Sequence, residues 1–375
     1  MARSLGLYLH IPFCLSKCRY CDFCSFPRTD TETMAAYTRE LCRRLEAHAP
    51  LCKDYVVDTV YLGGGTPCLL PLSEMERIFS TLRACYSLSG DAEITCECNP
   101  AATDRAYLRA LRTMGVNRLS IGVQSAHENE LRLLGRAHSF GDVKKLFDDA
   151  RAVGFDNVSA DLMYGIPDQT LESFASSIDA VCDLSPTHIS SYALSIEEGT
   201  PFFAMQDRLS LPDEDTEFAM YELLERTLAA RGYARYEISN FAKPDKESRH
   251  NLRYWKGEEY LGFGVAAHSD FGGARFGNSR EFAAFLRGED ITAEYGVSSK
   301  EEREEEYVML RLRLAEGIDL DAYQKRTGKS FAERYPNVPS LLRDGFLQET
   351  NGRIAFTTRG FFVSNAILSD MFAFT

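Results

Sequence analysis

The sequence predicts an α/β protein whose parallel sheet is built from repeated strand–helix units. Three observations support this class. Short apolar strand candidates alternate with amphipathic helical segments up to about residue 200, the repeat is about 30 residues long, and Gly, Pro, Cys or a polar residue ends each strand. Parallel strands need long, usually helical, crossovers, so the sheet is either doubly wound or bent into a complete or partial barrel.

Each predicted element has a local justification. The strand candidates are short apolar runs: Leu5–Ile11, Thr59–Gly63, Glu93–Glu97, Arg118–Gln124, Val158–Tyr164 and His188–Ile196. The helix candidates repeat apolar residues at helical spacing: Thr31–Ala47, Ser73–Cys85, Thr103–Met114, Phe140–Val153 and Leu171–Asp183. Both candidate architectures place their chemistry at the carboxyl ends of strands, so the residues that follow each strand form the candidate site.

The pattern changes after residue 200. Pro212–Gly232 predicts a long helix, Tyr233–Phe241 a further strand, and Lys243–Arg249 a polar segment before a Gly- and aromatic-rich stretch. A helix from Glu301 to Leu314 follows. Phe346–Thr350 and Arg353–Thr357, joined by Asn351-Gly352, predict a hairpin, and Phe361–Phe372 a last helix. Helices with a hairpin indicate a small winged-helix-like α+β module.

Composition narrows the function classes. The chain has 375 residues, with 42 Lys and Arg against 55 Asp and Glu, a net charge of −13 that disfavours nucleic acid and anionic membranes. It begins without a secretory signal pattern, and the longest uncharged stretch, Thr59–Ser73, is too short for a membrane helix. Eleven cysteines in a protein expected in the reducing cytoplasm point to metal binding or catalysis.

Cys14, Cys18 and Cys21 follow the first strand with the spacing C-x₃-C-x₂-C. Three thiolates in one short loop can bind three irons of a cubane cluster and leave the fourth iron open to a small molecule. A closed zinc site with Cys24 as a fourth ligand and a chance grouping are the alternatives. The spacing favours the iron–sulfur interpretation.

The segment from Tyr8 to Phe23 resembles the radical SAM superfamily, and within it the branch that contains oxygen-independent coproporphyrinogen III oxidase and the HemW-type haem chaperone. The resemblance implies a [4Fe–4S] cluster whose open iron is chelated by S-adenosylmethionine. It also implies a partial (β/α)₆ TIM-type barrel over residues 1–240, a haem-binding or linking segment over 241–300, and a small C-terminal domain over 301–375.

Other strand ends carry candidate contacts for S-adenosylmethionine. Glycines 63–65 and Thr66 follow the second strand, where backbone N–H groups can approach a carboxylate. Glu97 ends the third strand and can accept hydrogen bonds from ribose hydroxyls. Cys96 and Cys98 flank it on the opposite face, as expected for buried packing thiols.

Gln124, Arg136 and Asp161 could each be an ordinary strand-end cap or ion pair, but together they resemble the family's S-adenosylmethionine site. The residues that the resemblance assigns to it are Tyr8, Tyr20, Gly64, Gly65, Thr66, Glu97, Gln124, Arg136, Asp161 and Ala193. The remaining cysteines lack metal spacing and are interpreted as small apolar residues: Cys42, Cys52, Cys68, Cys85 and Cys182.

Three features favour the chaperone over the oxidase. The cluster loop begins at Cys14, which leaves no room for the N-terminal extension of the oxidase. Phe23 stands where the oxidase has a cysteine, although Cys24 is unusual for the chaperone. The segment from Arg249 to Trp255 matches the H-N-x-x-Y-W element proposed as the chaperone's haem site.

In that segment His250 could ligate haem iron, and Tyr254 and Trp255 could supply aromatic walls. A structural role for His250 is the alternative, and His268 is a second candidate ligand. Lysines and arginines surround His250 and would suit haem propionates, although a basic helix end is equally consistent: Lys246, Arg249, Arg253 and Lys256.

The resulting hypothesis is a cytoplasmic haem chaperone that carries a [4Fe–4S] cluster and S-adenosylmethionine. The alternatives are coproporphyrinogen III oxidase (dehydrogenase) and a radical SAM enzyme with another substrate, so enzymatic activity stays open. We expect haem and recipient haemoproteins as partners, an electron donor if the cluster is redox active, a homodimer as an option, at most peripheral membrane contact, and no nucleic acid.

Overall fold

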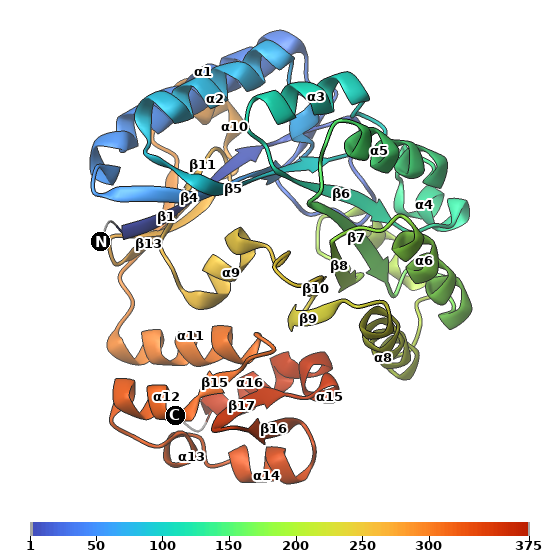
Figure 1. Cartoon of the computed structure of the whole chain (residues 1–375), viewed down its shortest axis with the longest axis vertical. Helices are drawn as coiled ribbons and strands as arrows, with labels where there is room; N and C mark the ends of the chain where they lie inside the picture. The colour runs from blue at the N-terminus through green and yellow to red at the C-terminus, as the bar shows by residue number, and fades with distance from the viewer. Residues whose placement is uncertain (1–2, 374–375) are drawn as a thin grey trace. The chain divides into compact units, whose positions relative to one another are not determined.

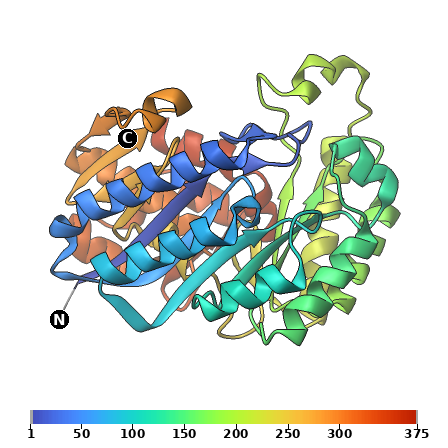
Figure 2. The same ribbon diagram turned by 90° about the horizontal axis from the view of Figure 1, so that it is seen from above.

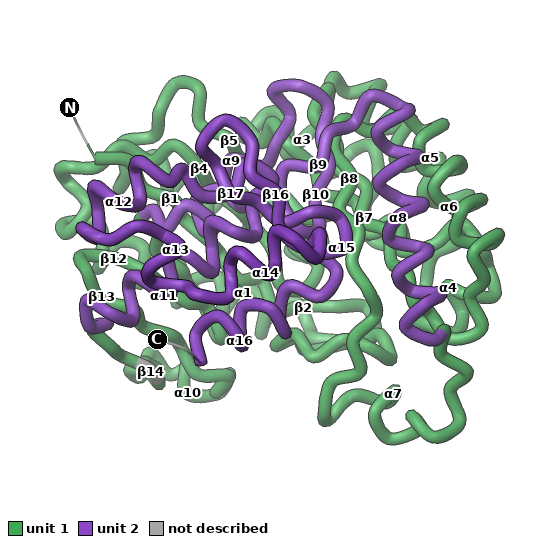
Figure 3. The backbone as a smooth tube through the Cα atoms, turned by 90° about the horizontal axis from the view of Figure 1, so that it is seen from below, with its two compact units in different colours: residues 1–212, 259–297 green, residues 213–258, 298–375 purple. Residues whose placement is uncertain are grey.

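The computed structural model describes residues 3–373, which form two compact units (Figure 3). Unit 1 contains residues 1–212 and 259–297, and unit 2 contains residues 213–258 and 298–375. The chain thus leaves unit 1 before a long helix and returns to it for one further segment. The expected domain division at residues 240 and 300 stays a prediction.

Unit 1 contains the predicted parallel sheet. Its central strands are β1 (Arg3–Ile11), β4 (Tyr55–Gly64), β5 (Leu88–Cys98), β6 (Arg118–Gln124), β7 (Val158–Tyr164) and β8 (His188–Ala193). They lie in this order and each pairs in parallel with the next. The α/β class and the partial-barrel architecture are confirmed. The other described elements of the strand–helix repeats are β2 (Phe13–Cys14), β3 (Phe26–Pro27), α1 (Thr31–His48), η1 (Ala49–Cys52), η2 (Pro67–Leu69), α2 (Leu72–Cys85), α3 (Arg105–Thr113), α4 (Glu128–Leu134), α5 (Phe140–Ala152), α6 (Leu171–Asp183), α7 (Pro201–Ala204) and η3 (Gln206–Arg208).

Because side chains alternate along each strand, one face of this sheet is apolar and the other is polar. On β1, Leu5, Leu7, Leu9 and Ile11 are fully buried on one face. Helices α1, α2, α3, α5 and α6 follow the outer face of the curved sheet (Figures 1 and 2). Burial of apolar area beneath these helices is the main stabilising contribution, at roughly 25 cal/mol per Å². The opposite face, inside the curve, is polar.

The Gly- and aromatic-rich stretch after residue 258, to which the sequence pattern assigns no element, contains several strands. The stretch returns to unit 1 as β11 (Tyr260–Phe263), β12 (His268–Phe271), β13 (Ala274–Asn278), α10 (Phe282–Leu286) and β14 (Thr292–Gly296). Strand β11 pairs in parallel with β1, and the others add antiparallel strands beyond it. The short strands are interrupted by glycines, which hides the alternation from a sequence pattern.

Unit 2 begins with α8 (Glu214–Ala230), β9 (Ala234–Glu237), β10 (Asn240–Ala242) and α9 (Arg249–Lys256). Tyr233–Phe241 is therefore not one strand, because the chain turns after Glu237 and β10 pairs antiparallel with β9. The small module contains α11 (Lys300–Leu312), β15 (Ile318–Asp319), α12 (Leu320–Thr327), α13 (Phe331–Arg334), α14 (Val338–Arg343), β16 (Leu347–Thr350), β17 (Arg353–Phe356), α15 (Thr358–Phe362) and α16 (Ser364–Ala373).

The predicted hairpin is β16–β17, and β15 adds a third antiparallel strand to it. The last helix begins later than expected, because Thr357 caps the separate short helix α15 and α16 starts at Ser364. Over residues 3–373, the helices are too short or too polar to cross a bilayer.

Candidate functional site

The inner face of the unit 1 sheet is lined by polar side chains in register. Tyr8 lies opposite Tyr61, Glu97 opposite Ser120, and Asp161 pairs with both Gly122 and Ser190. Tyr61 and Ser120 were not singled out from the sequence, although both lie in phase with the predicted Glu97 and Asp161. The period-two alternation of polar residues along β4 and β6 was the signal that could have found them.

The cluster loop leaves the carboxyl end of β1. Backbone hydrogen bonds from Phe26 N to Pro12 O (2.6 Å) and from Arg28 N to Cys14 O (3.1 Å) close this loop at its base. Cys14, Cys18 and Cys21 are partly exposed. Burial raises the pKa of Cys14 and raises that of Cys21 to about 11, so both are thiols at neutral pH until a metal displaces their protons.

Cys24 differs from these three cysteines because it is buried. Its backbone carbonyl accepts a hydrogen bond from Nε2 of His10 (2.8 Å), which is itself buried. Since a carbonyl only accepts, Nε2 carries the proton and Nδ1 accepts from the hydroxyl of Tyr8 (2.9 Å). His10, which sequence reasoning did not select, therefore connects the inner face of β1 to the end of the cluster loop.

The N–H groups of the glycine segment at the end of β4 have partners within the protein. The backbone N–H of Gly64 donates to Oε2 of Glu97 (3.1 Å), that of Gly65 to Ile11 O (2.9 Å) and that of Thr66 to Phe13 O (2.7 Å). These three N–H groups are thus paired within the protein, and the contact of this segment with S-adenosylmethionine stays a prediction. The glycines are needed for close packing: a Cβ on Gly65 would lie 2.6 Å from the carbonyl oxygen of Phe13.

Glu97 and Asp161 form an acidic pair on the inner face. Burial raises the pKa of Glu97 to about 7 and the negative charge of Asp161 adds to this rise, whereas hydrogen bonds from Tyr61 and Gly64 oppose it. Burial also raises the pKa of Asp161, whose Oδ1 accepts from the Ser120 hydroxyl at 3.1 Å. The buried guanidinium of Arg118 lowers the pKa of both carboxyls. Together they offer acceptor oxygens to a ligand with several hydroxyl groups.

Arg136 brings positive charge to the cluster loop. Its Nη1 lies 3.6 Å from Sγ of Cys18, and its Nη2 donates to the carbonyl of Gly122 (3.0 Å). Burial raises the pKa of the neighbouring Tyr20, and the Arg136 charge opposes this rise. A fixed guanidinium at this position can stabilise negative charge at the cluster or on a bound carboxylate.

Gln124 ends β6 in a left-handed backbone conformation, with φ of 69°. Its side-chain carbonyl accepts a hydrogen bond from the hydroxyl of Tyr192 (3.0 Å), which is exposed near the end of β8 beside Ala193. The assigned barrel residues therefore lie on six strands, β1 and β4 to β8, or in the segments that follow them. Their role in binding S-adenosylmethionine stays a prediction.

The predicted haem segment lies in unit 2 as helix α9. Ser248 caps the helix by accepting from Asn251 N, and Gly257 ends it in the left-handed conformation. His250 is only 1% exposed, and its Nε2 hydrogen-bonds the hydroxyl of Tyr254 at 2.8 Å, one helical turn further on. The imidazole is therefore held in place by a side chain from the same predicted site.

The basic residues of α9 do not all lie on the protein surface. Arg253 is 2% exposed and lies 3.6 Å from Glu258, so it does not join the exposed cations Arg249 and Lys256. Trp255 is half-buried and stacks against the guanidinium of Arg313, 5.9 Å from the ring centre. His268, the second candidate ligand, is exposed on β12 of unit 1.

Comparison with known families gives the class of protein. The model of the radical SAM superfamily matches residues 8–181, and that of the HemN C-terminal domain matches residues 298–363. The fold and the cysteine loop thus define a radical SAM protein of the HemN type. At the level of individual relatives, the chain belongs to the HemW family.

Two relatives illustrate that membership. The protein named heme chaperone HemW from Bacillus subtilis is 34% identical over 371 residues, which cover 96% of this chain and 97% of the relative. The protein of the same name from Escherichia coli is 33% identical over 369 residues, with 97% of each chain covered. Among solved structures, coproporphyrinogen III oxidase (HemN) from Escherichia coli, described as a radical SAM enzyme, superposes with a TM-score of 0.86 and 26% identity over 98% of this chain and 90% of that chain.

The radical SAM family implies a [4Fe–4S] cluster and S-adenosylmethionine, and the donor set of this chain fits them. Among residues 3–373, the group of three or more potential metal ligands whose donor atoms all lie within 4.8 Å is a different one, Cys68, Cys96 and Cys98. The sulfurs of Cys14, Cys18 and Cys21 are thus spread more widely than one zinc ion requires. A multi-iron cluster suits this wider spacing.

Proposed function

We propose that this chain is a haem chaperone, which binds haem and passes it to recipient haemoproteins. The observation that carries the proposal is similarity to HemW relatives over 96–97% of the chain, together with the intact His250–Trp255 element on a well-capped helix. In Escherichia coli the chaperone relative is 33% identical to this chain, against 26% for the oxidase, at comparable coverage.

In this proposal Cys14, Cys18 and Cys21 hold the [4Fe–4S] cluster, which supplies one-electron chemistry when S-adenosylmethionine is bound. Arg136 fixes positive charge next to Cys18. Glu97 and Asp161 accept hydrogen bonds from hydroxyl groups, and His10 keeps the end of the cluster loop on β1. The eleven cysteines are consistent with a reducing cytoplasm as the site of action.

His250 is the proposed haem ligand. Imidazole is the commonest protein ligand of haem iron, and its Nε2 is here paired with the Tyr254 hydroxyl at 2.8 Å. Haem iron would replace that hydroxyl as the partner of the nitrogen, while Trp255 and the ring of Tyr254 offer apolar surface to the macrocycle. The exposed Arg249 and Lys256 would pair with the propionates.

A haem titration of the full chain tests the ligand. His250→Ala should lose or shift the haem absorption of the wild type, whereas the matched variant His268→Ala, which changes an exposed histidine of unit 1, should leave the spectrum unchanged. Unchanged binding in His250→Ala would remove this residue from the site, and loss in His268→Ala alone would move the site to β12.

The oxidase is the second candidate, because the TM-score of 0.86 to HemN covers 98% of this chain. Anaerobically reconstituted protein can be given coproporphyrinogen III, a reductant and S-adenosylmethionine. As a chaperone it should form no protoporphyrinogen beyond a single turnover. Product formation at catalytic turnover would replace the chaperone proposal by the oxidase.

A further inference from the structure

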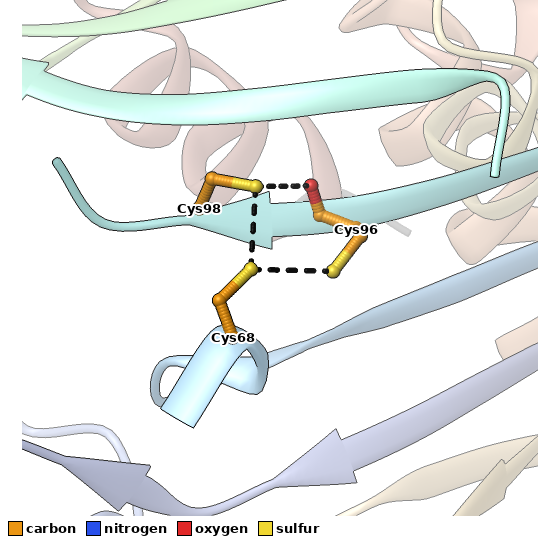
Figure 4. Close-up of side chains that lie close together, drawn as sticks. All are labelled: Cys68, Cys96 and Cys98. Carbon is orange, nitrogen blue, oxygen red and sulfur yellow. Dashed lines mark hydrogen bonds between the residues drawn. The ribbon is translucent and has the colours of Figure 1, made fainter. Parts of the chain in front are cut away.

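Three buried cysteines from two segments of the chain converge at the carboxyl end of β5. Cys68 lies on η2, directly after the glycine segment, and Cys96 and Cys98 lie on the outward face of β5. Figure 4 shows the three side chains turned toward one another. Cys96 and Cys98 are buried, as predicted, and Cys68, which has no metal spacing in the sequence, lies beside them in the structure.

The distances between the sulfur atoms of these cysteines match the distances between ligands of a single metal ion. Sγ of Cys68 lies 3.9 Å from Sγ of Cys96 and 3.4 Å from Sγ of Cys98, and all three sulfurs lie within 4.8 Å of one another. Zn–S bonds of about 2.3 Å at tetrahedral angles place two sulfurs about 3.8 Å apart. A disulfide would need about 2.0 Å, so these are not bonded pairs.

A main-chain carbonyl oxygen lies close to two of these sulfurs. The carbonyl oxygen of Glu97 lies 3.5 Å from Sγ of Cys68 and 3.6 Å from Sγ of Cys96. Oxygen and sulfur ligands of one tetrahedral zinc ion are about 3.6 Å apart. This carbonyl is therefore placed to complete a set of three sulfurs and one oxygen.

Burial decides which ion suits the site. Cys68, Cys96 and Cys98 are 3%, 0% and 4% exposed, so three thiolates here would carry three negative charges away from water. A divalent ion leaves one residual charge, whereas a monovalent ion such as Cu⁺ leaves two. Soft thiolates exclude Mg²⁺ and Ca²⁺, which prefer oxygen.

We propose that Cys68, Cys96 and Cys98 form a second metal site, separate from the cluster loop, that binds one Zn²⁺ ion. Binding replaces three S–H bonds by three Zn–S bonds and releases three protons, without any change of oxidation state. The ion would join η2 to the end of β5. It would thereby fix the glycine segment and the end of β5 from the face of the strand opposite the Glu97 side chain.

The test uses the full chain, prepared anaerobically with its iron–sulfur cluster, loaded with Zn²⁺ and dialysed. Metal analysis should find about one zinc per chain in addition to the cluster iron. Cys68→Ser, Cys96→Ser and Cys98→Ser should each lose the zinc and keep the iron. The matched control Cys42→Ser, which changes a buried cysteine on α1 outside this group, should keep both.

X-ray absorption at the zinc edge adds an element-specific readout on the wild type, which holds even if a serine variant fails to fold. It should show three sulfurs at about 2.3 Å and one lighter ligand. A wild type that retains no zinc, retention in the Cys68, Cys96 and Cys98 variants, zinc without sulfur ligands, or a Cys68–Cys98 disulfide in the anaerobic protein would each overturn the proposal. None of these measurements depends on haem or S-adenosylmethionine.

Discussion

The carboxylate of Glu97 accepts a hydrogen bond from the backbone N–H of Gly64 over 3.1 Å. The two residues are 33 positions apart in the chain and were predicted as separate contacts of a ligand. This hydrogen bond shows that the glycine segment and the end of β5 are directly connected. A change in either should therefore disturb the other, which gives the first two predictions.

Gly64→Ala should destabilise the protein by about 2 kcal/mol or more, because φ is 103° and the added Cβ would lie 2.5 Å from Nδ1 of His10. Cluster incorporation should fall as well, since His10 holds the end of the cluster loop. Denaturant unfolding and iron content measure the two effects. Gly90→Ala is the control, because nothing lies within 4 Å of its Cβ. Equal effects at both glycines would contradict the packing argument.

At about pH 8, above the raised pKa of the Glu97 carboxyl, Glu97→Gln should weaken S-adenosylmethionine binding by roughly tenfold or more, since hydrogen bonds to a charged acceptor are worth about 1.5–3 kcal/mol. Equilibrium binding to the anaerobic holoprotein measures this change. Glu93→Gln provides the comparison, because Glu93 is a buried carboxylate on the same face of β5 as Glu97 but further from the carboxyl end of the strand. Unaltered affinity in Glu97→Gln would exclude Glu97 from the binding site.

Cys14→Ala should abolish the iron–sulfur absorption and reduce the iron content from about four per chain to near zero. Cys24→Ala should keep both, because Cys24 is buried and reaches His10 through its backbone carbonyl, which the substitution preserves. Absorption spectra and iron analysis after anaerobic reconstitution distinguish the variants. Loss of the cluster in both would make Cys24 a ligand.

Tyr254→Phe should strengthen haem binding, since it removes the hydroxyl that occupies Nε2 of His250 at 2.8 Å and keeps the aromatic ring. A net hydrogen-bond energy of about 0.5–1.5 kcal/mol corresponds to roughly 2- to 10-fold in affinity. Haem titration at fixed pH measures the change. Weaker binding would mean that the hydroxyl itself supports the bound haem.

Glu237 should make the stability of the protein fall as pH rises. Its side chain is fully buried, Oε1 has no hydrogen-bond partner among residues 3–373, and burial raises its pKa from 4.5 to about 7. Because the folded pKa exceeds that of the unfolded chain, the stabilising contribution is complete below the unfolded value and is lost as pH rises through the folded one.

Glu237→Gln cannot ionise, so its free energy of unfolding should fall less than that of the wild type between about pH 5 and about pH 8, by about 1–3 kcal/mol. Urea unfolding at several pH values provides the measurement. Glu222→Gln, on the exposed side of α8, should behave as the wild type does. Parallel pH profiles for wild type and Glu237→Gln would show that Glu237 is already ionised at low pH.

The sequence predicted much of the barrel because the signals are local. The central strands and the helices of the repeats lie close to their expected positions, since periods of two and 3.6 residues are set by backbone geometry. The sequence pattern did not predict strand pairing between distant segments, such as that of β11 with β1 across some 250 residues of chain. It also missed the turn after Glu237 that divides one predicted strand into β9 and β10.

The sequence by itself determined the alternation of strands and helices, the cysteine loop after the first strand and the polar residues at the strand ends. The tertiary structure decided how side chains meet. It pairs the N–H of Gly64 with the carboxylate of Glu97 and the buried His250 with the hydroxyl of Tyr254. It also places the sulfur of Cys68 next to those of Cys96 and Cys98. Strand register and loop packing determine such contacts, and both are set by residues far apart in the chain.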